Sequence, residues 1–97
     1  MGERETIRRR ILDPDGRVVT LSEEAWDHIL EHKELERCEQ VIMDTIAFPD
    51  DRSDDERPNR ERYFTQGRGP TEYFCVVVEY IGEVGDVITA FGHRDPR

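Results

Sequence analysis

The sequence predicts an α+β domain with an N-terminal hairpin and two helices packed on one face of an antiparallel β-meander, in the order ββααβββ. Apolar residues recur at helical spacing between residues 23 and 48, whereas the flanking segments are short and strand-like. The run from Tyr73 to Val78 is apolar on both faces, as expected of a central strand covered by helices. A chain of 97 residues can bury one modest core, so we expect a single domain over residues 1–97.

The N-terminal hairpin is predicted by its turn. Residues 6–12 and 17–20 flank the segment Asp13-Pro14-Asp15-Gly16. An Asp-Gly pair can adopt the positive φ angles of a tight turn between two strands. We therefore expect the two flanking segments to pair.

Two helices are predicted to follow the hairpin. Ser22, with acidic residues directly after it, is typical of a helix N-cap, and Thr20 with Glu23 forms an alternative capping box. The apolar stripe extends this first helix to about Lys33. A second stripe over residues 38–48 predicts another helix, which ends where proline follows.

The second half of the chain reads as a loop and three strands. Residues 49–59 are acidic and almost free of apolar side chains, which is typical of a solvated loop. Residues 60–66, 72–81 and 86–91 have strand character and are separated by glycine-containing turns. We expect these three strands to form the meander, with residues 72–81 in the middle.

The composition limits the classes of partner. The chain has 14 Lys and Arg against 23 Asp and Glu, a net charge of −9, which argues against broad electrostatic binding of nucleic acid but leaves a local basic site open. Lys33 is the one lysine; the abundance of arginine suits phosphate contacts or reflects base composition of the gene. No apolar run reaches the roughly 20 residues of a membrane span, so no membrane partner is expected. The charged N-terminus shows no secretion signal, and two cysteines, Cys38 and Cys75, form no disulfide framework, which favours the cytoplasm.

Two histidines of the first helix are candidates for acid–base chemistry. His28 and His32 are four residues apart, so they project from one side of the helix, at the border of the apolar stripe. Imidazole exchanges protons near neutral pH, although two surface histidines with ordinary hydrogen bonds are an equally good interpretation. The sequence offers too few further ligands for zinc, so neither a metal nor another cofactor is expected.

Further polar candidates lie on the predicted strands. Alternation along residues 60–66 places Arg60 and Arg62 on the face opposite Tyr63, so these three side chains cannot line one site. Thr89 shares a predicted strand face with Phe91 and Val87, and Arg94 follows that strand. No glycine-rich phosphate loop or nucleophile motif is present, which argues against nucleotide-dependent and acyl-enzyme chemistry.

Taken together, these motifs resemble a known superfamily. The segments VVTLSEEAWDHILEHKEL, RYF, YFCVVVEY and VITAF, with a helix ending in Phe48-Pro49-Asp50 between the first two, resemble small phage and bacterial members of the barnase, EndoU, colicin and RelE-like nucleases. The resemblance covers about Val18 to Arg94. Proteins of this superfamily are typically metal-independent ribonucleases, and many are toxins that act on transfer or messenger RNA.

The resemblance implies a site and a mechanism. It nominates His28, His32, Tyr63 and Thr89 as catalytic residues, and Arg60, Arg62 and Arg94 as residues that bind the RNA substrate. A 2′-hydroxyl would attack the adjacent phosphorus, with histidine as acid or base and arginine stabilising the added phosphoryl charge. The implied partners are RNA and an antitoxin or other protein. The alternative is a catalytically inactive interaction domain whose acidic surface meets a basic protein.

Overall fold

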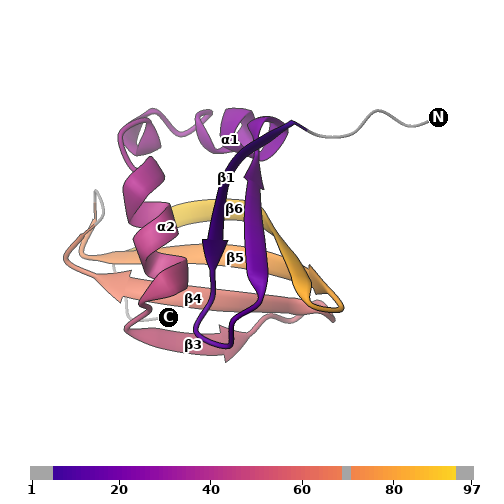
Figure 1. Ribbon diagram of the computed structural model, residues 1–97. Coiled ribbons are helices and arrows are strands. Elements are labelled where there is room, and N and C mark those ends of the chain that lie inside the picture. Colours follow the sequence, from indigo (N-terminus) through magenta and orange to yellow (C-terminus); the bar gives the residue numbers. More distant parts are fainter. Residues whose placement is uncertain (1–5, 69–70, 94–97) are drawn as a thin grey trace.

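The computed structural model describes residues 6–68 and 71–93, which form one sheet and its covering helices (Figure 1). The first half contains two strands, two α-helices and a short 3₁₀ helix: β1 (Ile7–Leu12), β2 (Val18–Ser22), α1 (Glu23–Ile29), the 3₁₀ helix (Lys33–Leu35) and α2 (Glu39–Ala47). The second half is all strand: β3 (Asp51–Asp54), β4 (Arg60–Gln66), β5 (Tyr73–Ile81) and β6 (Val84–His93).

The six strands form one sheet in the order β1-β2-β6-β5-β4-β3. Neighbours are antiparallel except β2 and β6, which run parallel over a short stretch from Val18↔Val84 to Thr20↔Asp86. Because so few residues pair there, the hairpin turns away from β6 and crosses in front of the meander beside α2 (Figure 1). The hairpin therefore covers the same face of the meander as the helices.

The core lies between this face of the meander and the elements in front of it. The two helices and the hairpin pack against β4, β5 and β6, which confirms that both helices cover one face of the sheet. The fully buried members of this core include Val19, Leu21, Ile29, Ile42, Met43, Ile46, Tyr63, Phe74, Val76 and Val78. Within the described ranges, no helix is long and apolar enough to cross a membrane.

The α+β class and the antiparallel meander are confirmed, but the predicted order ββααβββ is wrong by one strand. Within the segment expected to be a loop, β3 pairs with β4 from Asp51↔Phe64 to Asp54↔Glu61. This strand lies at the sheet edge, where backbone pairing on one side is enough and charged side chains stay in solvent. This strand was missed because its acidic sequence lacks the alternating apolar residues that predict a strand.

The ends of the first helix were predicted unequally well. Ser22 is the N-cap, since its Oγ accepts the N–H of Ala25 at 3.0 Å. The helix ends at Ile29 rather than near Lys33, and a 3₁₀ turn follows that buries Leu35. After α1 the chain thus bends and brings Leu35 into the core. A straight helix that continued to Lys33 would not make this bend.

Candidate functional site

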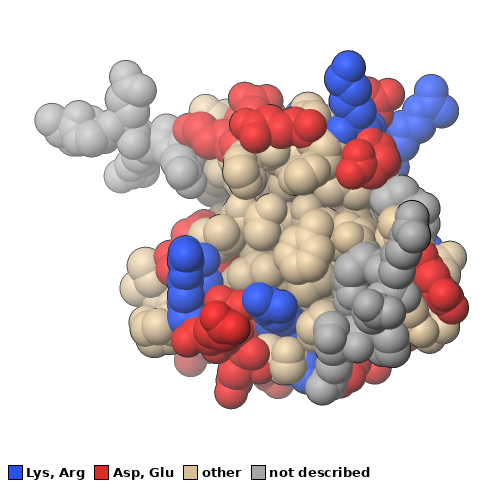
Figure 2. Space-filling model, turned by 180° about the vertical axis from the view of Figure 1, so that it is seen from behind, with Lys and Arg blue, Asp and Glu red and all other residues tan. Residues whose placement is uncertain are grey.

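The meander has two faces that carry different side chains. Tyr63 points into the core beneath the helices, whereas its neighbours on β4, Arg60 and Arg62, lie on the opposite face. That separation was predicted from alternation and is confirmed. We call the face that carries the two arginines the open face, because among the described residues no helix or hairpin packs on it. Figure 2 shows it from behind, with an uncharged middle and neighbouring basic and acidic side chains at its lower rim. The buried residues on this face, Phe64, Cys75 and Val77, are apolar.

The open face carries a hollow of about 310 Å³. It is lined by residues of the β3–β4 turn and of the three meander strands: Asp55, Glu56, Arg57, Arg60, Arg62, Val77, Thr89 and Phe91. Three residues nominated from the sequence, Arg60, Arg62 and Thr89, therefore meet at one place. We call this the open-face hollow.

A β-bulge decides which way Thr89 points. The pairs Val78↔Val87 and Val77↔Thr89 leave Ile88 as an extra residue in β6. Val87 is consequently buried in the helix-covered core, while Thr89 lines the open-face hollow. The expectation that Thr89 and Val87 share a face is therefore wrong, because the inserted residue reverses the alternation between them.

Each of the two arginines is held by one carboxylate, which in both cases accepts a hydrogen bond from Nε. Arg62 Nε donates to Asp55 Oδ1 at 2.6 Å, and Arg60 Nε donates to Glu79 Oε2 at 3.2 Å. The hydrogen bond from Arg62 holds the pKa of Asp55 below its usual range. In residues 6–68 and 71–93, the terminal nitrogens of both guanidinium groups make no hydrogen bond, and the side chains of Arg62 and Arg60 are 38% and 19% exposed.

The open-face hollow differs in charge from the rest of the chain. Three arginines, Arg57, Arg60 and Arg62, line it together with Asp55 and Glu56, and Glu79 pairs with Arg60, so the local charges sum to 3 − 3 = 0. The whole chain carries −9. A guanidinium-rich hollow of this kind suits an oxyanion such as phosphate, which accepts paired N–H groups.

The histidines of the first helix lie elsewhere. His28 is on α1 and His32 precedes the 3₁₀ helix, and their side chains are 56% and 54% exposed. Their nearest acidic partners are Glu31, 3.8 Å from His28 Nδ1, and Glu34, 3.9 Å from His32 Nδ1. Neither histidine lines the open-face hollow.

Tyr63 is fully buried on the other side of the sheet. Its hydroxyl lies 2.5 Å from that of Tyr80, which lies 2.8 Å from Asp13 Oδ2. The Tyr63 hydroxyl also lies 3.3 Å from Asp13 Oδ2, so either tyrosine can be the donor in the bond between the two hydroxyls. Burial raises the pKa of Tyr63. This tyrosine therefore serves a buried network rather than the open-face hollow.

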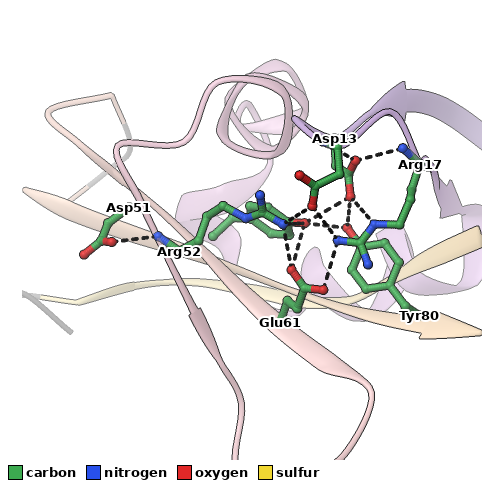
Figure 3. A network of polar contacts seen from close by, with 8 residues as sticks. Asp13, Arg17, Asp51, Arg52, Glu61 and Tyr80 are labelled. Atoms are coloured by element: carbon green, nitrogen blue, oxygen red, sulfur yellow. Dashed lines mark hydrogen bonds and ion pairs between the residues drawn. The ribbon is translucent and has the colours of Figure 1, made fainter. Parts of the chain in front are cut away.

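The centre of that network is the carboxylate of Asp13, whose side chain is completely buried (Figure 3). In addition to Tyr80, it accepts the N–H groups of Asp15 and Arg17 at 2.9 Å each and Arg17 Nε at 2.8 Å. Burial favours the neutral acid, but the hydrogen bonds from Arg17 and Tyr80 outweigh it and hold the pKa of Asp13 below its usual range.

Ion pairs extend the network to the sheet edge. Glu61 accepts Arg17 at 2.9 Å with one oxygen and Arg52 at 2.8 Å with the other. Arg17 also stacks 3.7 Å from the centre of the Tyr80 ring. The Asp-Pro-Asp-Gly turn is the only feature of the sequence that singled out Asp13. No local sequence pattern indicates that Tyr63, Tyr80 and Glu61 belong to the same network. The network joins the hairpin to the meander, and we assign it a structural role.

The remaining expectations concern metals and Arg94. Among the described residues, no group of three or more His, Cys, Asp or Glu side chains could hold a metal ion. Arg94 lies outside the described residues.

No protein-family model, curated protein or solved structure matches the chain. The resemblance to ribonucleases and the roles it implies therefore stay predictions.

Proposed function

We propose that the protein binds single-stranded RNA on the open face of its sheet. The observation that carries this proposal is the convergence of Arg60, Arg62 and Thr89 around one hollow. Arginines that bind phosphate, beside an apolar surface that accepts bases, are the usual elements of single-strand recognition. The motif resemblance to ribonucleases points to the same class of ligand.

The ion-paired carboxylates leave the terminal nitrogens of both arginines for a phosphate. Asp55 and Glu79 occupy only the Nε side of their arginines. Each guanidinium keeps its terminal nitrogens and loses rotational freedom, which reduces the entropic cost of binding a phosphate. Thr89 adds a hydroxyl that donates to a phosphate oxygen.

The resemblance also implies cleavage of the bound RNA, but the open-face hollow offers few groups for acid–base catalysis. Among its described lining residues, Asp55 and Glu56 are the titratable carboxylates, and Asp55 is engaged by Arg62. Acid–base catalysis by His28 and His32 would require RNA to reach the exposed side of α1. Binding is thus the function we propose, and cleavage is an outcome to be measured beside it.

The first prediction compares RNA binding by three proteins. A fluorescent 2′-O-methyl oligouridine is used as probe, because it lacks the 2′-hydroxyl that a ribonuclease needs. The double variant Arg60→Gln, Arg62→Gln should bind at least about tenfold more weakly than the wild type, because charge-assisted contacts to phosphate are lost. The variant His28→Ala, His32→Ala should bind like the wild type. Fluorescence anisotropy in low salt measures both.

The same three proteins are then incubated with unmodified transfer RNA in EDTA. Cleavage that disappears in the arginine variant but persists in the histidine variant would extend the proposal to catalysis on the open face. Wild-type protein that is folded yet does not bind the probe would contradict the proposal. So would an arginine variant that binds the probe as tightly as the wild type.

A protein-interaction domain is the second candidate, and one observation favours it. Between Glu24 and Glu36 the chain exposes five carboxylates, and the only Lys or Arg in that stretch is Lys33. Such a surface attracts a basic partner. Absence of RNA binding by the wild type would favour this function, with the acidic side of α1 as the contact.

A further inference from the structure

The two arginines of the open-face hollow are spaced along a single strand. Arg60 and Arg62 are two residues apart on β4, so their Cα atoms are about 6.6 Å apart. That separation is close to the distance between consecutive phosphates of an extended nucleic-acid strand. Because both side chains lie on the open face, they offer two neighbouring cationic positions in line with β4.

Each position is fixed by a separate element. Glu79 lies directly across from Arg60 on β5, whereas Asp55 belongs to the turn that leads into β4. The Asp55 side chain is only 8% exposed, and its second carboxylate oxygen accepts the N–H of Arg57 at 3.3 Å. The two guanidinium groups are thus anchored by different carboxylates on different elements, so each can bind a phosphate of its own.

The surface beside the two arginines suits the bases of the same strand. Val77, from β5 next to β4, and Phe91, from β6 on the far side of β5, also line the open-face hollow. Base stacking on an aromatic ring tolerates any sequence, since every base has a π face. Phosphates over β4 and bases toward β6 would use both sides of the hollow.

We propose that Arg60 and Arg62 bind two consecutive phosphates of one RNA strand that runs along β4. The inference rests on the proposed RNA binding and adds the path of the strand and its shortest recognised unit, which contains two phosphates. Asp55 and Glu79 act as positioning residues in this arrangement, because they hold the guanidinium groups without contacting the RNA.

The salt dependence of binding tests whether the contacts are separate. For single strands, the slope of log affinity against log salt is about −0.7 per phosphate contacted. Arg60→Gln and Arg62→Gln should each make the slope less steep by about 0.7, and the double variant by about 1.4, with the 2′-O-methyl oligouridine as probe. Arg37→Gln, an exposed arginine between the 3₁₀ helix and α2, is the matched control and should leave the slope unchanged.

Lysine variants separate lost charge from lost fold. Arg60→Lys and Arg62→Lys keep the charge, so they should keep the wild-type slope even where the affinity falls. Circular dichroism melts establish that every variant is folded under the assay conditions. A slope that changes in a glutamine variant but not in the lysine variant at the same position supports a phosphate contact there.

The outcomes distinguish the two-phosphate inference from the proposed RNA binding on which it rests. If either single glutamine variant changes the slope as much as the double variant, both arginines bind one phosphate and the inference fails while RNA binding stands. The same holds if the slope stays constant in variants that bind RNA. If the folded wild type does not bind the probe, RNA binding itself fails. Additive slopes support two phosphates.

Discussion

Replacing Asp13 by alanine should lower the free energy of unfolding by about 3–5 kcal/mol, as expected when one partner of a buried ion pair is removed. The change leaves Arg17 and the hydroxyl of Tyr80 without their acceptor. It also releases the N–H groups of Asp15 and Arg17, which the carboxylate gathers within the hairpin turn. Because a domain of this size is stable by only about 5–15 kcal/mol, the loss is a large fraction of the total.

The measurement is urea denaturation followed by the fluorescence of Trp26, which is buried on α1. Asp15→Ala is the matched control, since it removes a carboxylate two residues away in the same turn. The Asp15 side chain is 56% exposed, so solvent screens its ion pairs with Arg17 and Arg52 and the variant should lose much less stability than Asp13→Ala. Equal losses from the two variants would mean that Asp13 does not organise the network.

The same carboxylate predicts how stability depends on pH. The pKa of Asp13 is lower in the folded protein than in the unfolded chain, so the folded state releases this proton more readily. Its contribution is therefore complete above the unfolded pKa of about 3.9 and is lost as the pH falls through the folded pKa. The stability difference between wild type and Asp13→Asn should be large at pH 7 and shrink below about pH 4. A difference that stays constant over this range would contradict the assigned pKa shift.

This network also marks the limit of prediction from sequence. The hairpin, the Ser22 cap and the central position of β5 followed from turn chemistry and residue patterns, which act within a few residues. The partners of Asp13 at Tyr63 and Tyr80 are 50 and 67 residues away along the chain. No local pattern encodes such contacts, because they exist only once the hairpin crosses the meander.

The candidate site was predictable to a similar degree. Alternation on β4 separated Arg60 and Arg62 from Tyr63, and the structure agrees. The carboxylate anchors of the two arginines were not foreseen, since one comes from a turn and the other from β5. The bulge at Ile88 was missed as well, because it inserts a residue without any glycine or proline to mark it.

Replacing Gly85 by alanine, which adds only one methyl group, should also destabilise the protein strongly. Gly85 pairs with Tyr80 on one side and with Val19 on the other, where β6 meets the hairpin. A Cβ there would lie 2.7 Å from Tyr80 Cε1 and 2.8 Å from Val78 Cγ1. We expect Gly85→Ala to lower the free energy of unfolding by about 1–3 kcal/mol, the usual cost of overpacking a core.

The cost depends on whether the Tyr80 ring can move aside, and the network prevents it. The Arg17 guanidinium covers the ring at 3.7 Å, and the hydroxyl is bound to Asp13 at 2.8 Å. A double-mutant cycle with Tyr80→Leu tests this, since leucine removes the ring atom that the new methyl group would meet. Gly85→Ala should then cost less in the Tyr80→Leu background than in the wild type. If its cost is the same in both, the contact with the Tyr80 ring does not determine the cost, and the remaining contact with Val78 does.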